Sequence, residues 1–294
     1  TLLAMLRRNR TFADVGALAL AASILFAGSL STAAASSSAA GAPAVTVQAD
    51  RGKSPVVNYV ALGDSYAAGQ GAGFYENECL QSSLSYPELL DDMKHMKLIA
   101  DASCSGATTA DVIGQLTEIR PNKHIDLITL TVGANDVGSA ALVAACTASF
   151  TSPECQAALT AAIALMTPPA PRVPSELAVR LATTFTAVAM AAPGATIMVT
   201  GYPYLFETPP STDPNYEAIV QLREATTTLN ETIEGLVDQL ALTGIDIRYV
   251  DVTAAFAGHG IGSADPGINA TGQDAFPATA AGYLAYSRAI RAEL

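Results

Sequence analysis

Three short turns of small polar residues each follow an apolar run in this sequence. They are Gly63-Asp64-Ser65, Cys104-Ser105-Gly106 and Gly133-Ala134-Asn135. A helical pattern opens after each turn, so each turn is expected between the carboxyl end of a strand and the start of a helix. Because the carboxyl ends of parallel strands meet at one edge of an open α/β sheet, we expect the three turns to lie close together.

Ser65 in the first turn is a candidate nucleophile. A serine hydroxyl attacks a carbonyl only when a base takes its proton, and the charge that develops on the carbonyl oxygen needs preorganised donors. The backbone N–H groups of Ser65 and Gly106 and the side-chain amide of Asn135 could supply such donors. Glycine allows a close backbone approach, and asparagine brings an uncharged NH₂ group. The alternative is that Gly106 and Asn135 only shape their turns.

With these turns the chain resembles the SGNH hydrolases, the superfamily of GDSL-type esterases and lipases, in its secreted actinobacterial form. Ser65, Gly106 and Asn135 match the family's first three motif positions, and Asp274 matches the aspartate of its final Asp-x-x-His block. The resemblance covers nearly all of residues 56–294. It implies an α/β fold, a three-layer α/β/α sandwich of the flavodoxin-like kind with a mostly parallel sheet. It also implies ester hydrolysis through an acyl-enzyme at Ser65.

One motif position departs from the family pattern. Pro277 stands where the family has its catalytic histidine, in the segment Asp-Ala-Phe-Pro-Ala. The chain contains three histidines: His95, His124 and His259. His95 lies in a charged segment, interpreted as a solvated helical face, and His124 precedes a predicted strand and so belongs to the amino edge of the sheet. His259 follows the last predicted strand, at the reactive edge, and is therefore our candidate replacement base; the alternative is a loop histidine that binds substrate or only packs.

Two functions from different classes follow from this pattern. The first is a secreted serine esterase or lipase that hydrolyses acyl or acetyl esters, with Ser65, Asp274 and His259 as candidate catalytic residues. The second is an SGNH-fold pseudoenzyme, weak or inactive, that binds an ester, lipid or glycan. Loss of a triad residue leaves about 10³–10⁴-fold catalysis over water from binding and the oxyanion hole, so weak turnover would fit both. In either case we expect a small-molecule ester or lipid ligand and no cofactor.

The N-terminal 45 residues have the pattern of a secretory signal peptide. Three arginines precede an uncharged apolar run from Val15 to Leu30, and small residues follow it. The run is short for a membrane span, so we expect a cleaved leader and no stable span afterwards, with an uncleaved anchor as the alternative. Residues 46–55 are interpreted as a linker and residues 56–294 as one hydrolase domain. The protein is therefore expected outside the cell or in the cell envelope.

The chain is acidic, with a formal net charge of −12. Residues 1–45 carry three arginines and one aspartate, so their removal would bring the charge to −14. A protein of this charge repels nucleic acids and anionic membrane surfaces. We therefore expect no nucleic-acid partner, and we expect a monomer.

Four cysteines in an exported chain indicate disulfides rather than metal ligands or redox thiols. Four cysteines allow three pairings, which the sequence alone does not separate. The family pattern and proximity along the chain favour Cys79–Cys104 and Cys146–Cys155. Neither pair has histidine or aspartate at zinc spacing, so no metal site is expected.

Strands are expected to alternate with helices along the domain. The predicted strands cover residues 56–62, 98–102, 125–132, 195–201 and 246–251. The predicted helices cover residues 107–119, 136–147, 173–192, 215–243 and 279–292. This alternation is typical of right-handed βαβ units and a mostly parallel sheet. The glycine-rich residues 69–73 are interpreted as a rim loop of the site rather than a phosphate-binding loop.

Overall fold

Apolar strands form one parallel sheet at the centre of the molecule. The computed structural model describes residues 55–119, 124–146, 149–272 and 274–294, and within them the sheet has five strands. The strands are β1 (Val57–Gly63), β2 (Met96–Asp101), β3 (Leu127–Thr131), β4 (Thr196–Thr200) and β5 (Ile247–Val250). Every pairing between them is parallel. Every residue of β3 is buried, which explains why this strand reads as an apolar run rather than as an alternating one.

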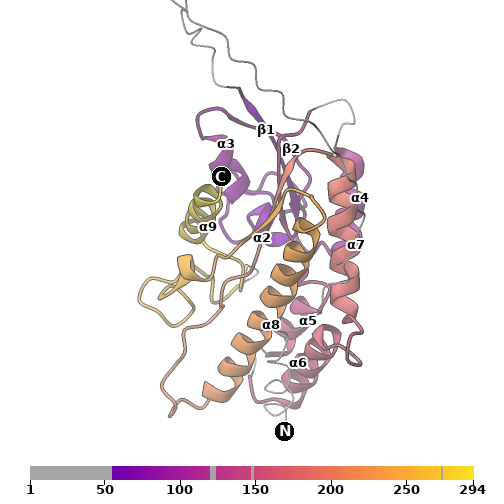
Figure 1. The fold of residues 1–294 in the computed structure, drawn as a ribbon. Coiled ribbons are helices and arrows are strands. Elements are labelled where there is room, and N and C mark those ends of the chain that lie inside the picture. The colour runs from indigo at the N-terminus through magenta and orange to yellow at the C-terminus, as the bar shows by residue number, and fades with distance from the viewer. Residues whose placement is uncertain (1–54, 120–123, 147–148, 273) are drawn as a thin grey trace, which may run out of the picture. The chain divides into compact units, whose positions relative to one another are not determined.

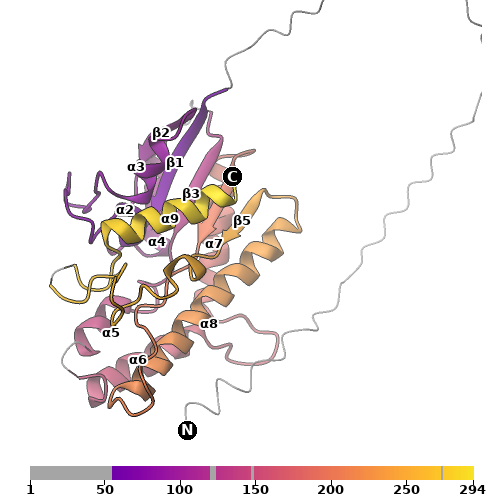
Figure 2. The same ribbon diagram turned by 90° about the vertical axis from the view of Figure 1, so that its left-hand side faces the viewer.

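Helices cover both faces of this sheet. The helices with bounds in the described residues are α2 (Ser65–Ala68), α3 (Tyr86–Asp91), α4 (Thr109–Gln115), α5 (Ser139–Cys146), α6 (Pro153–Met166), α7 (Glu176–Ala191), α8 (Tyr216–Ala241) and α9 (Ala280–Ala292), with the 3₁₀ turns η2 (Leu116–Glu118) and η3 (Ala254–Phe256). Figures 1 and 2 show α3 and α9 on one face and α4, α7 and α8 on the other. The predicted three-layer α/β/α sandwich is therefore confirmed.

Side-chain caps fix where several helices begin. Asp64 accepts a hydrogen bond from the N–H of Tyr66 at the start of α2. Thr108 and Asp111 form a reciprocal capping box at the start of α4, and Thr279 caps α9. Such caps satisfy N–H groups that have no partner within the helix. The predicted elements agree with the observed ones within three residues at each end when η2 is counted as the continuation of α4, whereas α2, α3 and α6 were not predicted.

The strand order creates a crevice at the carboxyl edge. The order is β2-β1-β3-β4-β5, so the chain leaves β1 toward one neighbour and later returns to its other side. Ligands of open α/β folds bind at such a reversal point, outside the carboxyl ends of the strands. Gly63 at the end of β1 has φ +129°, and a side chain there would place its Cβ 2.2 Å from the carbonyl oxygen of Thr131. Only glycine therefore allows β1 and β3 to approach this closely beside the site.

Two disulfides lie at the same end of the molecule. Cys79 is bonded to Cys104, and Cys146 is bonded to Cys155, with Cα separations of 4.3 and 4.6 Å. The first joins the loop after α2 to the turn after β2, and the second joins the end of α5 to the first turn of α6. This is the pairing that the family resemblance implies.

The remaining sequence expectations concern the N-terminus. The predicted signal peptide, residues 1–45, lies outside the described residues, as does nearly all of the predicted linker. Among the described residues, no helix is long and apolar enough to cross a membrane. Residues 52–294 form one compact unit that contains the whole sheet.

Candidate active site

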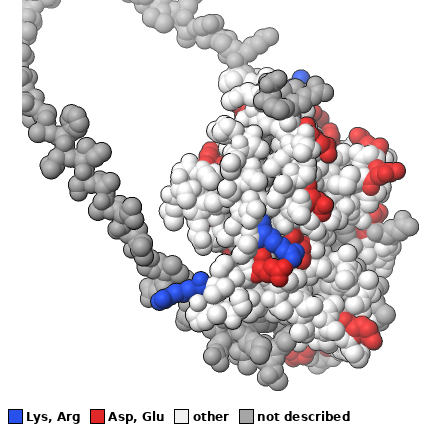
Figure 3. Space-filling view, turned by 90° about the vertical axis from the view of Figure 1, so that its right-hand side faces the viewer, with Lys and Arg blue, Asp and Glu red and all other residues white. Residues whose placement is uncertain are grey.

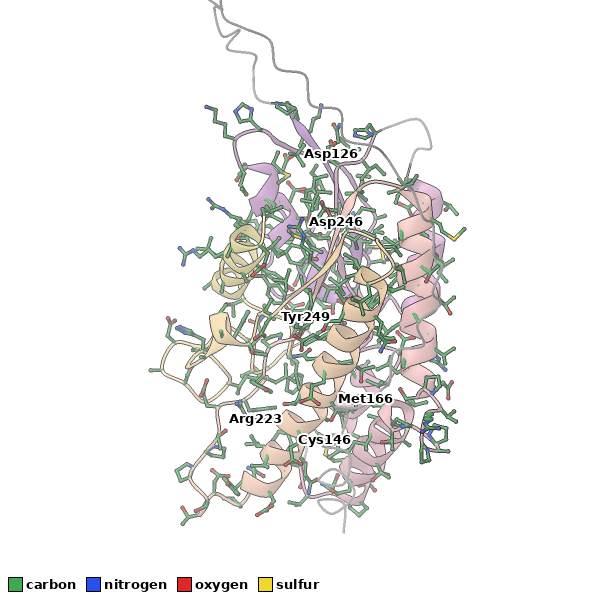
Figure 4. The ribbon with its side chains drawn as sticks, in the orientation of Figure 1. Asp126, Cys146, Met166, Arg223, Asp246 and Tyr249 are labelled. Carbon is green, nitrogen blue, oxygen red and sulfur yellow. A yellow bond between two sulfur atoms is a disulfide. The ribbon has the colours of Figure 1, made fainter. Side chains whose placement is uncertain are left out.

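A cavity of about 380 Å³ opens at the carboxyl edge of the sheet. Its walls come from the turns after β1, β2, β3 and β4, from α5, α6 and α8, and from residues 275–277. In Figure 4, Asp126 and Asp246 mark the amino ends of β3 and β5, and Met166 and Arg223 mark the cavity end of the molecule. Ser65, Gly106 and Asn135 all line this cavity. The three turns singled out in the sequence therefore meet as expected.

Ser65 presents two groups to the cavity. It is the first residue of α2, so its N–H has no acceptor within the helix. Within the described residues, neither this N–H nor the side-chain hydroxyl has a hydrogen-bond partner. The nucleophile candidate is half-buried and is not paired with any base in the described part of the chain.

Two further donors lie in the neighbouring turns. Gly106 has φ +84°, a backbone conformation that favours glycine, and its N–H makes no hydrogen bond to the described residues. The Asn135 side chain is oriented at both ends: Nδ2 donates to the carbonyl of Ala107 (2.9 Å), and Oδ1 accepts from the hydroxyl of Ser139 (3.1 Å). A side-chain amide has two N–H groups, so one remains for a ligand. The cavity therefore holds a serine hydroxyl and three donors that could bind an oxyanion.

Buried polar contacts from α4 and the turn after β3 hold two of these turns. The Gln115 side chain accepts from the N–H of Gly63 and donates to its carbonyl, both at 2.9 Å. Asp136 accepts from the N–H (2.9 Å) and the hydroxyl (2.6 Å) of Thr109, and it lies 3.6 Å from Arg180. The turn of Ser65 and the turn of Asn135 are thus both hydrogen-bonded to α4. Asp136 stands next to Asn135 in a recognisable motif, whereas Gln115 had no sequence signal.

Asp64 is a buried carboxyl beside the nucleophile. Its Oδ2 accepts a hydrogen bond from the Tyr202 hydroxyl (2.6 Å), and that hydroxyl accepts one from the N–H of Ala134 (3.2 Å). Burial raises the pKa of Asp64 from 3.8 to about 7, although the hydrogen bonds from Tyr202 and the N–H of Tyr66 lower it. The Tyr202 phenol thereby connects the turn of Ser65 to the turn of Asn135. Tyr202 has no local signal in the sequence, because its link to Asp64 spans 138 residues.

The histidines lie away from the cavity. None of the residues that line it is a histidine, within the part of the chain that the structure describes. His259 is exposed, and its Nδ1 lies 2.8 Å from the carbonyl oxygen of Asp265. His124 pairs with Asp126 at the amino edge of the sheet, as expected. His95 stands in the turn before β2 with φ +69°, not on the predicted helical face.

Asp274 also points elsewhere. It does not line the cavity, and its carboxylate lies beside the Tyr75 hydroxyl. The pKa of Tyr75 is raised, first by partial burial and also by this neighbouring carboxylate. The structure therefore brings Ser65, Gly106 and Asn135 together, but it brings neither Asp274 nor His259 to the cavity.

Comparison with known proteins gives the family. Residues 61–284 match the sequence pattern of the GDSL-like lipase/acylhydrolase family. The chain belongs to this family. A lipase of Streptomyces rimosus is 31% identical over 218 residues, which cover 72% of this chain and 76% of that protein. Lipase 1 of Streptomyces coelicolor is 29% identical over 217 residues, which cover 72% of this chain and 75% of the relative.

Solved structures agree with this assignment. The crystal structure of the extracellular lipase from Streptomyces rimosus has a TM-score of 0.71 and 27% identity, and the match covers 81% of this chain and all of that one. The phospholipase A1 from Streptomyces albidoflavus NA297 has a TM-score of 0.70, with the same identity and coverage. The chain is therefore an SGNH-type hydrolase with the three-layer fold of the lipases it resembles.

In this GDSL-like hydrolase Pro277 itself lines the cavity. Its segment is firmly held: the Tyr66 hydroxyl donates to the carbonyl of Phe276 (2.7 Å), and the Asn269 side chain donates to the carbonyls of Pro277 (3.1 Å) and Ala278 (3.2 Å). The residue at which the sequence pattern predicts the family's histidine is thus at the site. A pyrrolidine ring stands there in place of an imidazole, so this position supplies no proton acceptor.

The rest of the lipase-like cavity is largely apolar. Its wall away from Ser65 is formed by side chains of α5, α6 and α8, among them Leu142, Ala162, Met166, Leu222, Ala225 and Leu229. Such a wall suits a hydrocarbon chain more than a sugar, because it offers few hydrogen-bonding groups. No group of three or more potential metal ligands occurs among the described residues.

Proposed function

We propose that this chain is a secreted serine esterase or lipase that hydrolyses acyl esters through an acyl-enzyme at Ser65. The observation that carries the proposal is the meeting of the Ser65 hydroxyl with three hydrogen-bond donors in one cavity. Its apolar wall and the lipases among its relatives support an acyl substrate. The two disulfides and the extracellular relative support export. Cleavage of residues 1–45 remains part of this proposal.

The reaction would begin with the ester carbonyl above Ser65. The hydroxyl oxygen attacks the carbonyl carbon, and the carbonyl oxygen takes the negative charge. The N–H groups of Ser65 and Gly106 and the Asn135 amide would bind that charge, in a site where no reorganisation of water is needed. Collapse of the intermediate breaks the bond between the carbonyl carbon and the alcohol oxygen, and the base gives the serine proton to that oxygen. The acyl chain stays on Ser65, along the apolar wall. A water molecule then attacks the acyl carbonyl, its proton passes through the base to the Ser65 oxygen, and the acid is released.

Removal of the serine proton is the step for which the cavity supplies no positioned base among the described residues. Pro277 cannot accept a proton, and Asp274 lies beside Tyr75. His259 remains the candidate base, but it would have to leave the carbonyl of Asp265 to come within hydrogen-bond reach of Ser65. We therefore expect slow turnover in the wild-type protein. The second candidate function, a pseudoenzyme that binds an ester or lipid, is favoured by Pro277 alone.

The test is hydrolysis of p-nitrophenyl butyrate by the exported protein and its variants. Ser65→Ala should abolish turnover, and Asn135→Ala should lower kcat by about 10²–10³-fold by removing one oxyanion donor. Pro277→His, alone and with Ala278→Pro, should raise the rate markedly. The N–H of Ala278 has no partner among the described residues, so a proline there removes no hydrogen bond.

The outcomes separate the candidates. If His259→Ala abolishes turnover and the restored histidine adds little, His259 is the base. If the wild type is no faster than Ser65→Ala but binds acyl ligands, the pseudoenzyme is the correct reading. Robust wild-type activity that survives His259→Ala would show that another group takes the proton.

A further inference from the structure

Arg223 is a cation in an otherwise apolar wall. It lies near the start of α8, and Figure 4 shows it at the cavity end of the molecule. Among the described residues that line the cavity, it is the only lysine or arginine. Its neighbours on the same helix, Leu222 and Ala225, are apolar and line the cavity too. A charged side chain at this position needs an explanation, because removing a charge from water is costly.

The guanidinium is held in place from one side. Its Nη1 donates to the carbonyl of Phe206 (2.6 Å), and its carbon lies 4.0 Å from the centre of the Tyr204 ring. Phe206 packs edge-on against Phe276, with ring centres 5.8 Å apart, next to Pro277. Arg223 is thereby placed on the side of the cavity formed by residues 275–277. The apolar side chains of α5 and α6 form another part of the wall.

Two arginines elsewhere in the fold have acidic partners, whereas Arg223 at the cavity has none among the described residues. Arg180 lies 3.6 Å from Asp136, and Arg248 lies 3.1 Å from Asp246. Within the part of the chain that the structure describes, Arg223 forms no ion pair, and only one of its N–H groups donates a hydrogen bond. A guanidinium has five donors in a planar fork that matches the oxygens of phosphate. A positioned, unpaired fork of this kind is suited to an anionic ligand.

We propose that Arg223 binds a phosphate group on the alcohol side of the substrate, so that the substrate class is phosphate-bearing acyl esters. The proposal rests on the proposed function for the location of the acyl chain, but not on turnover. The acyl chain would follow the apolar wall of α5, α6 and α8. The phosphate would lie at Arg223, beside Phe206 and Phe276. Acidic groups are scattered over the face of α4 and α7 in Figure 3, and the chain as a whole is acidic. Among the described residues that line the cavity, Arg223 is the one cation, so it would give this acidic protein a local preference for anions.

The experiment measures binding by calorimetry with three probes of equal chain length, below their micelle concentrations: octyl phosphate, octyl glucoside and octanoate. The exported wild type should bind octyl phosphate most tightly. Arg223→Gln should lower the affinity for octyl phosphate at least about tenfold, because it removes a charge-assisted hydrogen bond. It should change the affinity for octyl glucoside less than about twofold. Arg223→Lys should retain part of the difference. Arg248→Gln is the matched control, because it removes an exposed arginine on β5, and it should change neither value.

Each other result would overturn the proposal. If Arg223→Gln weakens both octyl phosphate and octyl glucoside equally, Arg223 only fastens the segment of Phe206 to α8. If octanoate binds as tightly as octyl phosphate, the site binds anions in general and does not select phosphate. If Arg223→Gln changes no probe, the cavity has no anion subsite. Ser65→Ala should bind like wild type, so failure of the catalytic proposal would remain distinguishable from failure of this one.

Discussion

Asp64 and Ser65 are neighbours in the sequence but lie in different surroundings. Asp64 is 1% exposed and its carboxyl accepts a hydrogen bond from the Tyr202 phenol, whereas Ser65 lines the cavity. Because the same phenol accepts the N–H of Ala134, the carboxyl is linked to the turns on both sides of the site. A carboxyl in this position stays partly protonated near neutral pH, since burial raises its pKa to about 7.

This burial predicts a pH dependence of stability. An aspartate has a pKa of 3.8 in the unfolded chain, and the pKa of Asp64 and of Asp101 in the folded protein is about 7. Between these values the native state binds protons that the unfolded state has lost, so the free energy of unfolding falls as pH rises from about 4 to 7. The slope approaches about 1.4 kcal/mol per pH unit for each carboxyl.

Urea unfolding of the wild type and of Asp64→Asn between pH 4 and 8 measures this slope. The pH slope of the free energy of unfolding should be smaller in the variant, whatever its absolute stability, because the asparagine does not take up the proton that Asp64 binds in the folded state. Asp126→Asn is the control, since this carboxyl lies at the other end of the sheet. A wild-type stability that rises with pH across this window would show that the buried carboxyls do not control it.

At the scale of the elements, strands and turns were predictable from the sequence, but the long-range hydrogen bonds that hold the turns in place were not. Buried strands read as apolar runs, and caps such as Thr108 and Thr279 mark helix starts, so both leave local signals. Gln115 and Tyr202 act across 52 and 138 residues, and nothing in their own neighbourhood indicates this. The loop of His259 has no periodicity, so its contact with the carbonyl of Asp265 could not be predicted from the sequence.

The contact between α4 and β1 gives a prediction at this scale. Gln115→Ala would leave the N–H of Gly63 without a partner in a buried position, whereas the carbonyl of Gly63 would keep the hydrogen bond that it accepts from the N–H of Cys104 (3.0 Å). One unsatisfied backbone N–H should lower the free energy of unfolding by about 1–3 kcal/mol. Thr117→Ala is the control, because Thr117 is exposed and bonds only within its own turn. Chemical denaturation should find the first variant much less stable; equal stability of the two would mean that water replaces the glutamine.

For the whole molecule, charge and crosslinks act in opposite directions. The chain has 27 acidic residues against 15 lysines and arginines, and Figure 3 shows acidic groups spread over the face of α4 and α7. Such a balance keeps a protein soluble but works against a compact state through self-repulsion. Disulfides counter this because they restrict the unfolded chain. Cys104 precedes the cavity-lining residues Ser105 and Gly106, and Cys146–Cys155 joins the cavity-lining helices α5 and α6, so both disulfides also constrain the walls of the cavity.

Removal of the two disulfides should lower the free energy of unfolding by different amounts. Cys79–Cys104 spans 25 residues and Cys146–Cys155 spans 9, so the chain-entropy relation gives about 3.5 and about 2.6 kcal/mol. Cys79→Ser with Cys104→Ser should therefore destabilise the protein by about 1 kcal/mol more than Cys146→Ser with Cys155→Ser.

The first pair also holds the turn of Gly106, because the N–H of Ser105 donates to the carbonyl of Cys79 (3.0 Å). Its loss should weaken the binding of acyl ligands as well. Denaturation curves and ligand titrations of the two double variants check both expectations, and the reverse order of stability would show that the native contacts of α5 and α6, rather than loop length, determine the cost.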